Sequence, residues 1–199
     1  MIKHVIFDLG NVLVNIHPQK TMQEFANRCG FSTEKINSFY LSDLHLGFMA
    51  GEYLPDEFYN NMMDRFTCNI SQEEFNEIWN RVIGEPKEGI AYLVNQLKSN
   101  YDLSVCSNTD PWHWEVARKK CRFINDFQNY FLSFEMKPNK PDLKIFKAIL
   151  DKLPATGNEC VFIDDLKENI EAASTFGIKG ILASESEQMR AGLRELGLL

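Results

Sequence analysis

The sequence predicts an α/β fold, a doubly wound parallel sheet that carries an inserted all-helical segment. Short apolar runs typical of buried strands alternate with helix-type periodicity near both ends of the chain, which is the pattern of a parallel sheet covered by helices. Between these parts, residues 18–84 show helical periodicity alone. We therefore expect an α/β core of residues 1–17 and 85–199, a helical subdomain of residues 18–84, and hinges near residues 14–18 and 84–88.

The first expected strand is Val5-Ile6-Phe7, an apolar run that is too short for a helix and ends at Asp8. In open α/β sheets, ligands bind at the carboxyl ends of the strands. A carboxylate buried alone is costly, so Asp8 needs a cation or a covalent role there. On this stretch alone, however, an acid that only caps the next turn is the simpler interpretation.

The helices of the inserted segment are predicted from residues that begin helices and from apolar faces. Pro55 marks one helix start, and a capping box of Ser71 and Glu74 marks another. Pro86 is expected to open a further helix just after the segment. The apolar faces repeat at helical spacing and include Met22, Phe25, Phe58, Met62, Phe66, Phe75, Ile78, Trp79 and Val82.

Three strands of the expected sheet end in polar residues that could perform chemistry. The strands of the second part are expected at residues 103–106, 131–134, 160–163 and 180–182. Asp8 follows the first strand of the chain, and Ser107-Asn108 and Asp164-Asp165 follow two of the later ones. Since parallel strands share one carboxyl edge, the fold should gather these side chains in one crevice.

The acids of this crevice predict a divalent cation. Asp8, Asp164 and Asp165 would repel one another unless a hard cation lay among them, and Mg²⁺ prefers carboxylates, waters and phosphate oxygens. Lys140 precedes Pro141 in a loop that is too rich in proline to be a helix. Its ammonium group could face the acids and hold an anion.

The motifs FDLGNV, SNT, KPD and DD occur in this order along almost the whole chain. Through them the sequence resembles the haloacid dehalogenase-like (HAD) phosphohydrolases. Within these it looks most like the bacterial sugar-1-phosphate phosphatases typified by α-D-glucose-1-phosphate phosphatase. The resemblance implies a Rossmann-like HAD core with a helical cap, and a hydrolase of phosphoric monoesters.

The resemblance also implies catalytic roles. Asp8 would be the nucleophile that attacks phosphorus and forms an aspartyl phosphate, which is a form of covalent catalysis. Ser107 and the backbone at Asn108 would bind the oxygens of the transferred phosphoryl group. Lys140 would pair with Asp8 and with the phosphate, and so offset their like-charge repulsion.

The same resemblance implies a set of metal ligands. Asp8 and Asp165 would ligate Mg²⁺ together with the backbone carbonyl of Gly10. Asp164 would be a further ligand, or would act through a water molecule. Asn169, one helical turn beyond, would steady this motif rather than bind the metal.

The chain departs from the family pattern at Gly10, where a second Asp usually acts as general acid and base. Such a group contributes about 10²–10⁴-fold in rate. The sugar phosphatase subgroup carries Gly there as well, so the departure bears on rate and substrate choice, and leaving groups that depart easily should suffer least. His113 and His17 are alternative proton donors, although packing by the aromatic run around His113 explains that residue equally well.

Composition narrows the class of protein and its surroundings. The 199 residues carry a formal net charge of −7 without a basic stripe, which argues against nucleic-acid binding. No run approaches the roughly 18 apolar residues of a membrane span, and Asp8 interrupts the apolar run near the N-terminus, so we expect neither a membrane span nor a signal peptide, and a cytoplasmic location. The five cysteines are odd in number and form no Cys-x-x-Cys pair, so we expect reduced thiols at Cys29, Cys68, Cys106, Cys121 and Cys160.

The leading hypothesis is a magnesium-dependent phosphatase for a small soluble phosphate monoester, with sugar phosphates among the candidates. One alternative is a haloacid dehalogenase, which uses the same Asp nucleophile without metal; the Asp164-Asp165 pair argues against it. The other alternative is a non-catalytic HAD-like protein that binds a phosphorylated ligand. The sequence predicts neither the identity of the ester nor the oligomeric state.

Overall fold

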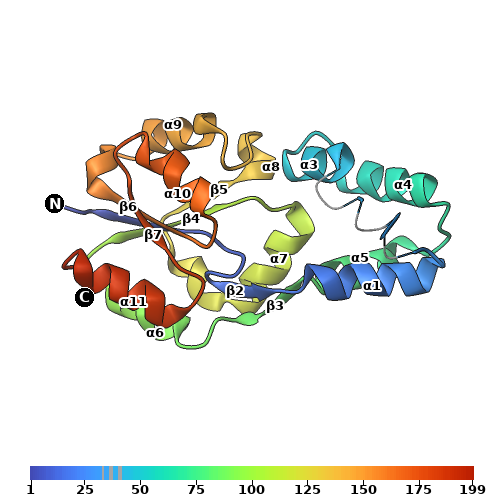
Figure 1. Cartoon of the computed structure of the whole chain (residues 1–199), viewed down its shortest axis with the longest axis horizontal. Coiled ribbons are helices and arrows are strands. Elements are labelled where there is room, and N and C mark those ends of the chain that lie inside the picture. Colours follow the sequence, from blue (N-terminus) through green and yellow to red (C-terminus); the bar gives the residue numbers. More distant parts are fainter. Residues whose placement is uncertain (33, 36–37, 40–41) are drawn as a thin grey trace.

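The computed structural model describes residues 1–32, 34–35, 38–39 and 42–199. At its centre is a five-stranded sheet with the order β5-β4-β1-β6-β7, in which each neighbouring pair is parallel (Figure 1). The first strand of the chain is therefore the central one, and the predicted doubly wound parallel fold is confirmed. The strands are β1 (His4–Phe7), β4 (Asp102–Ser107), β5 (Asn129–Leu132), β6 (Cys160–Asp164) and β7 (Lys179–Leu182).

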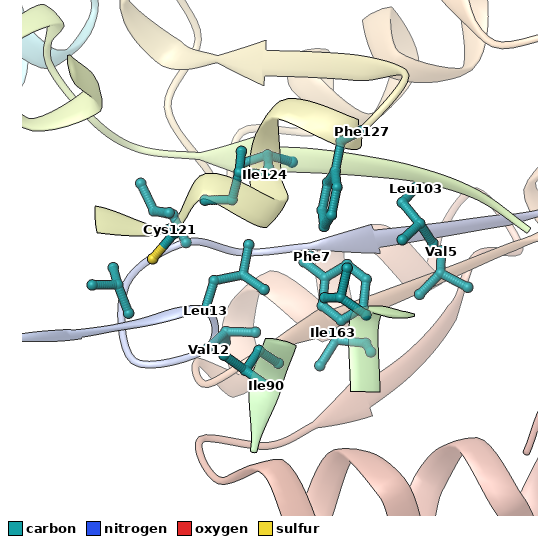
Figure 2. Packing of buried hydrophobic residues seen from close by; sticks show 14 of the residues in the cluster. Val5, Phe7, Val12, Leu13, Ile90, Leu103, Cys121, Ile124, Phe127 and Ile163 are labelled. Carbon is teal, nitrogen blue, oxygen red and sulfur yellow. The ribbon is translucent and has the colours of Figure 1, made fainter. Parts of the chain in front are cut away.

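Helices cover both faces of the sheet: α6 (Ile90–Leu97), α7 (Pro111–Lys120), α9 (Leu143–Lys152), α10 (Lys167–Ser174) and α11 (Ser186–Glu195). Val5 and Phe7 of β1 pack with α6, α7 and α11, whereas Ile6 packs with α9 and α10 on the opposite face. Figure 2 shows Phe7 among its apolar neighbours, with its ring centroid 5.8 Å from that of Phe127. Because full burial of such a side chain contributes about 1.5–3 kcal/mol, this packing holds β1 in place. Short 3-10 helices complete the core, namely η1 (Arg122–Asp126) and η2 (Gly157–Glu159).

A second group of helices lies beyond the carboxyl edge of the sheet (Figure 1): α1 (Pro18–Cys29), α3 (Asp43–Met49), α4 (Pro55–Phe66) and α5 (Gln72–Asn80). They share a core cluster of their own, in which the Phe48 and Phe58 rings stack 4.0 Å apart and the Phe75 and Trp79 rings stack 5.9 Å apart. We keep a helical cap of residues 18–84 as a proposal, which this separate cluster supports. Within the described ranges, no helix is long and apolar enough to cross a membrane.

Two strands connect the two parts of the chain. β2 (Val14–Ile16) and β3 (Ile83–Pro86) pair antiparallel where we expected hinges. The prediction of a helix start at Pro86 is wrong, because Pro86 ends β3 and α6 begins only at Ile90. Gly89 precedes that helix with a φ of 73°, a left-handed conformation that glycine adopts without steric cost.

Two other local predictions change in detail. The Ser71 hydroxyl accepts a hydrogen bond from the Glu74 amide (3.2 Å) as expected, but the Glu74 carboxylate pairs with Arg28 of α1. β5 ends at Leu132, so the strand predicted to reach residue 134 is too long. Ser133 opens α8 (Ser133–Met136), and its hydroxyl accepts from the Thr109 amide (3.0 Å) and donates to the Thr109 carbonyl (3.1 Å). This serine therefore holds the loop that follows β4.

The expectation of reduced cysteines is wrong for one pair. Cys29 at the end of α1 and Cys68 after α4 form a disulfide with a Cα–Cα distance of 5.3 Å. They are 39 residues apart, and only the folding of the helical segment brings them together. Cys106, Cys121 and Cys160 are buried free thiols, as expected.

The disulfide should stabilise the protein, because it restricts the unfolded chain. For a loop of this length, replacing Cys29 and Cys68 by alanine should lower the free energy of unfolding by about 2–4 kcal/mol. Urea titration of the wild type with and without reductant measures the effect, and the double variant should not respond to reductant. A wild type that is equally stable with reductant, and that shows all its thiols reactive in denaturant alone, would contradict this.

Candidate active site

The carboxyl ends of β1, β4 and β6 bring the predicted polar residues to one edge of the sheet. Phe7 is in register with Ile163 of β6, and the Asp8 amide donates a hydrogen bond to the Ile163 carbonyl (2.9 Å). Asp8 therefore lies in the centre, between Asp164 on β6 and Ser107 at the end of β4. All three side chains are buried.

Lys140 reaches into this edge from the loop between α8 and α9. Its Nζ lies 2.8 Å from Asp8 Oδ1 and 2.6 Å from Asp164 Oδ2. The Asn108 side chain fixes the backbone of the lysine, since its Nδ2 donates to the Lys140 carbonyl (2.9 Å) and its Oδ1 accepts from the Lys140 amide (2.7 Å). Asn108, which we expected to act through its backbone, thus has a positioning role for its side chain as well.

Asp164 uses both of its oxygens within the protein. Oδ2 pairs with Lys140, and Oδ1 accepts hydrogen bonds from the Leu166 amide and from Asn169 Nδ2, both at 2.9 Å. Asn169 thus steadies the acidic motif, as the resemblance implied. The carboxylate of Asp164 serves mainly to hold its neighbours.

Asp165 is more open than Asp164. It is about half-buried, and its Oδ2 accepts a hydrogen bond from Asn11 Nδ2 (3.0 Å). Asn11 has a φ of 56°, a left-handed conformation that asparagine tolerates better than most residues. We did not assign Asn11 a role from the sequence, although its place in the FDLGNV motif was a signal.

The acids and the lysine perturb one another strongly. Burial raises the pKa of Asp8 to about 7; Lys140 opposes the shift, and the neighbouring acids add to it. Burial likewise raises the pKa of Asp165. Burial alone would lower the pKa of Lys140, but Asp8 and Asp164 outweigh it and raise that pKa above its usual range. The lysine is therefore charged, and extra positive charge would favour the ionised acids.

The donor set suits a hard divalent cation. Asp8, Asp164 and Asp165 each offer an oxygen, and these atoms lie within 4.8 Å of one another. Lys140 neutralises one of the three negative charges when all are ionised. Carboxylate oxygens on a partly open site are the ligands that Mg²⁺ prefers, so the residues fit the predicted metal.

A cavity of about 90 Å³ lies between the sheet edge and the helical segment. Gly10, Ser107 and Asn108 form its sheet side. Side chains from β2, α1, α3 and α5 and from residues 82–83 close it from the other side, namely Ile16, Met22, Met49, Trp79, Val82 and Ile83. The helical segment therefore faces the part of the sheet edge that carries Gly10, Ser107 and Asn108.

Gly10 has no side chain, and the side chain of Ile16 lies next to the position that a Cβ atom would take. A Cβ atom at position 10 would lie 3.4 Å from both Cδ1 and Cγ2 of Ile16, an ordinary contact distance. The backbone of Gly10 is not in the left-handed region, so a larger residue could adopt it. The surroundings of position 10 are thus apolar on the side of Ile16.

A buried hydrogen-bond network joins the helical segment to the core beside this cavity. Asp110, at the start of α7, accepts from the Trp79 indole (3.0 Å) and lies 2.7 Å from His113 Nδ1. His113 Nε2 lies 2.9 Å from the Trp79 carbonyl, and the two rings stack at 5.1 Å. Burial opposes both charges, yet the pairing lowers the pKa of Asp110 and raises that of His113.

These contacts decide between the alternatives for the histidines. Both ring nitrogens of His113 have partners in the protein, which favours the packing role over proton donation. His17 is not among the residues that line the cavity; it lines a surface hollow with Glu77 and Lys120. His45 lies in the cavity wall, and burial lowers its pKa to about 4.

Comparison with known proteins agrees with this geometry. The family model described as haloacid dehalogenase-like hydrolase matches residues 2–177. The chain belongs to this hydrolase family. Membership confirms the resemblance at the level of the family, whereas the narrower likeness to glucose-1-phosphate phosphatases stays a prediction.

Several relatives of this HAD hydrolase cover nearly the whole chain. A D-ribitol-5-phosphate phosphatase of Bacteroides thetaiotaomicron is 24% identical over 90% of each sequence. A sesquiterpene phosphatase of Aspergillus oryzae is 23% identical over 98% of this chain and 96% of that one. A crystal structure of a HAD enzyme of B. thetaiotaomicron, in complex with magnesium and inorganic phosphate, is 28% identical with a TM-score of 0.83, and the match covers 90% of this chain and 93% of that one.

The buried pair Asp110–His113 predicts a pH-dependent contribution to stability. The raised pKa of His113 means that the stabilisation is complete below pH 6.5 and is lost as the pH rises through the raised value. The lowered pKa of Asp110 means that it is also lost as the pH falls below 3.8. NMR titration of the His113 imidazole should give a pKa above 6.5 in the wild type.

The variant Asp110→Asn provides the control, because it keeps the shape of the side chain and removes its charge. Burial then dominates, and the pKa of His113 should fall below 6.5. In His113→Gln, the loss of unfolding free energy above pH 6.5 should disappear. If the His113 imidazole titrates at the same pH in the wild type and in Asp110→Asn, the charge of Asp110 does not cause the raised pKa of His113.

Proposed function

We propose that this HAD hydrolase is a Mg²⁺-dependent phosphatase, and that it cleaves a small phosphate monoester through an aspartyl-phosphate intermediate on Asp8. The observation that carries the proposal is the buried Asp8 carboxylate at the end of the central strand. Lys140 Nζ lies 2.8 Å from it, and two further acids lie close by. A fold that only bound phosphate would not need a carboxylate facing the anion.

Asp8 is the proposed nucleophile. One of its oxygens forms a bond to phosphorus while the bond from phosphorus to the ester oxygen breaks, and the departing oxygen takes a proton from water. A water molecule then cleaves the aspartyl phosphate, which releases inorganic phosphate and restores the carboxylate. Ser107 and the Asn108 backbone are proposed to bind the phosphoryl oxygens, and Lys140 to offset the charge that approaches Asp8.

Mg²⁺ is proposed to bind Asp8, Asp165 and the backbone carbonyl of Gly10. When bound, the cation would neutralise negative charge on the acids and the phosphate. Asp164 is proposed to support this set indirectly, because its oxygens already hold Lys140, Leu166 and Asn169.

Both the relatives and the charges of the site support this proposal over its alternatives. Full-length relatives at 23–24% identity are named as phosphatases, and a structure at 28% identity holds magnesium and phosphate. A dehalogenase without metal would leave two of the three negative charges of Asp8, Asp164 and Asp165 uncompensated, because Lys140 offsets only one. A non-catalytic binding protein would have no use for an ionised Asp8 beside the phosphate.

Phosphate release from a panel of small phosphate esters and one acyl phosphate, acetyl phosphate, tests the proposal directly. The panel should include acetyl phosphate, phenyl phosphate, glucose 1-phosphate and ribitol 5-phosphate, each with Mg²⁺ and with EDTA. We expect hydrolysis that requires Mg²⁺ and falls at least about 10³-fold in Asp8→Asn, because the nucleophile is lost. Activity that persists in EDTA would refute the metal requirement, and activity that persists in Asp8→Asn would refute the covalent step.

The metal ligand Asp165 is tested separately by calorimetric Mg²⁺ titration. Asp165→Asn should weaken Mg²⁺ affinity by at least about tenfold, since it removes a charged oxygen ligand. Glu171→Gln removes an exposed carboxylate of α10 that pairs with Lys167, and it should bind Mg²⁺ as the wild type does. Equal affinity in all three proteins would remove Asp165 from the ligand set.

The missing acid at Gly10 predicts a steep dependence on the leaving group. Without a proton donor at this position, kcat/KM for a series of aryl phosphates should rise strongly as the pKa of the leaving phenol falls. Gly10→Asp should flatten this dependence, because a Cβ fits beside Ile16 and the new carboxyl group could donate a proton. A flat dependence in the wild type would mean that another group supplies the proton.

A further inference from the structure

We propose that the alcohol half of the substrate is compact and mostly apolar. The substrate would be the monophosphate of a short branched alcohol or of a phenol, rather than of a sugar or polyol. This inference rests on the phosphatase activity proposed above, and it concerns the cavity between the sheet edge and the helical segment.

We place the esterified group in this cavity because of its position next to the proposed phosphate site. Its sheet side is formed by Gly10, Ser107 and Asn108, which are the residues beside the proposed nucleophile and phosphate. The helical segment closes the opposite side with Met22, Met49 and other residues. A phosphate bound at the strand ends would therefore direct the rest of the ester into this space.

The wall opposite the phosphate end is apolar. Ile16, Met22, Met49, Trp79, Val82 and Ile83 form most of it. Among the described lining residues there is no carboxylate, lysine or arginine. Burial of a hydrocarbon group against such a wall is favourable, whereas the hydroxyls of a sugar would find few hydrogen-bond partners there.

The polar side chains in the wall are largely committed to other partners. Both ring nitrogens of His113 bond within the network of Asp110 and Trp79, and the Asn108 side chain holds the backbone of Lys140. Burial lowers the pKa of His45 to about 4, so this ring offers no positive charge at neutral pH. A polyol would bury several hydroxyls here with too few partners, and each unmatched hydroxyl would carry a desolvation penalty.

The size of the cavity limits the group further. The cavity has a volume of about 90 Å³, against roughly 150 Å³ for a closed cavity that holds benzene. A compact group of a few carbons therefore matches its size better than a long isoprenoid chain does.

Gly10 and Ile16 fit the same conclusion. Position 10 carries no acid, and the space beside it is bounded by Cδ1 and Cγ2 of Ile16. An apolar leaving group can pack against this isoleucine directly. The chain thus presents hydrocarbon where the family pattern usually has a carboxylate.

The test compares esters of primary alcohols, so that the leaving groups have similar basicity. We expect kcat/KM for 3-methylbutyl phosphate to exceed that for ribitol 5-phosphate by at least about 100-fold, since each unmatched hydroxyl costs roughly tenfold. Farnesyl monophosphate should be a poor substrate because its chain exceeds the cavity. Acetyl phosphate, which hardly enters the cavity, reports phosphoryl transfer itself.

Variants of the wall provide the matched comparison. Met49→Gln keeps the length of the side chain and adds an amide, so it should reduce the preference for 3-methylbutyl phosphate over ribitol 5-phosphate by about tenfold. Val82→Thr keeps the shape and adds a hydroxyl, and it should act in the same direction. Leu54→Ala changes an exposed side chain of the helical segment outside the cavity, and should leave the preference unchanged.

The outcomes separate this inference from the proposed function. A preference for ribitol 5-phosphate, efficient hydrolysis of farnesyl monophosphate, or hydrolysis of acetyl phosphate alone would overturn the substrate class and leave the phosphatase standing. A wild-type preference that Met49→Gln and Val82→Thr do not alter would overturn the role of this wall. If no compound, acetyl phosphate included, releases phosphate in a manner that depends on Asp8, the proposed function itself is wrong.

Discussion

The ion triad of Lys140 with Asp8 and Asp164 is the constraint on which the rest of the site depends. All three side chains are buried, and the lysine lies within 2.8 Å of both acids. Removing one partner from a buried ion pair typically costs 3–5 kcal/mol, because the other charge is left without compensation. The triad therefore explains why Asn108, Leu166 and Asn169 all serve to hold it. It joins the central strand, a neighbouring strand and the loop before α9 at one point, so the nucleophile proposed for the reaction is also a centre of the fold.

The adjacent acids Asp164 and Asp165 differ in burial and in hydrogen-bond partners. Asp164 ends a buried strand, and its oxygens accept hydrogen bonds from Lys140, the Leu166 amide and Asn169. Asp165, one residue further, is half-exposed and is held by Asn11 through one oxygen. Asp164 is the last residue of β6, whereas Asp165 stands in the bend that follows, so the two acids differ in burial although their oxygens lie within 4.8 Å of each other. The proposed division into a supporting acid and a metal ligand follows from this geometry.

The convergence of the polar side chains of the candidate site could be predicted from strands and local motifs, whereas contacts that cross the chain could not. Asp8, Ser107 and Asp164 could be placed together because buried strands are recognisable as short apolar runs, and parallel strands share one carboxyl edge. The link from Trp79 to Asp110 was missed, because nothing in either local sequence shows that an indole from the helical segment reaches a helix start in the core. The Cys29–Cys68 disulfide was missed for a similar reason, since a separation of 39 residues has no characteristic spacing. Pro86 and Ser133 were assigned to the wrong elements, because each stands at a boundary where tertiary hydrogen bonds, rather than local preference, decide.

The network of Trp79, Asp110 and His113 explains how an apolar cavity can exist directly above a strongly charged edge. The indole nitrogen donates to Asp110, and the two imidazole nitrogens lie beside Asp110 and the Trp79 backbone carbonyl, so the ring nitrogens of both cavity-lining residues are paired within the protein. Ile16 completes this lining beside Gly10, where a side-chain acid would have brought charge into the same space. The absence of an acid at position 10 and the presence of Ile16 beside it thus keep charge out of the same space. In the proposed reaction, the charge lies on the sheet side around Asp8, and the helical side contributes shape and the exclusion of water. Selectivity would then arise mainly because the helical side lacks hydrogen-bond partners for hydroxyl groups, and less from the contacts that it makes with the substrate.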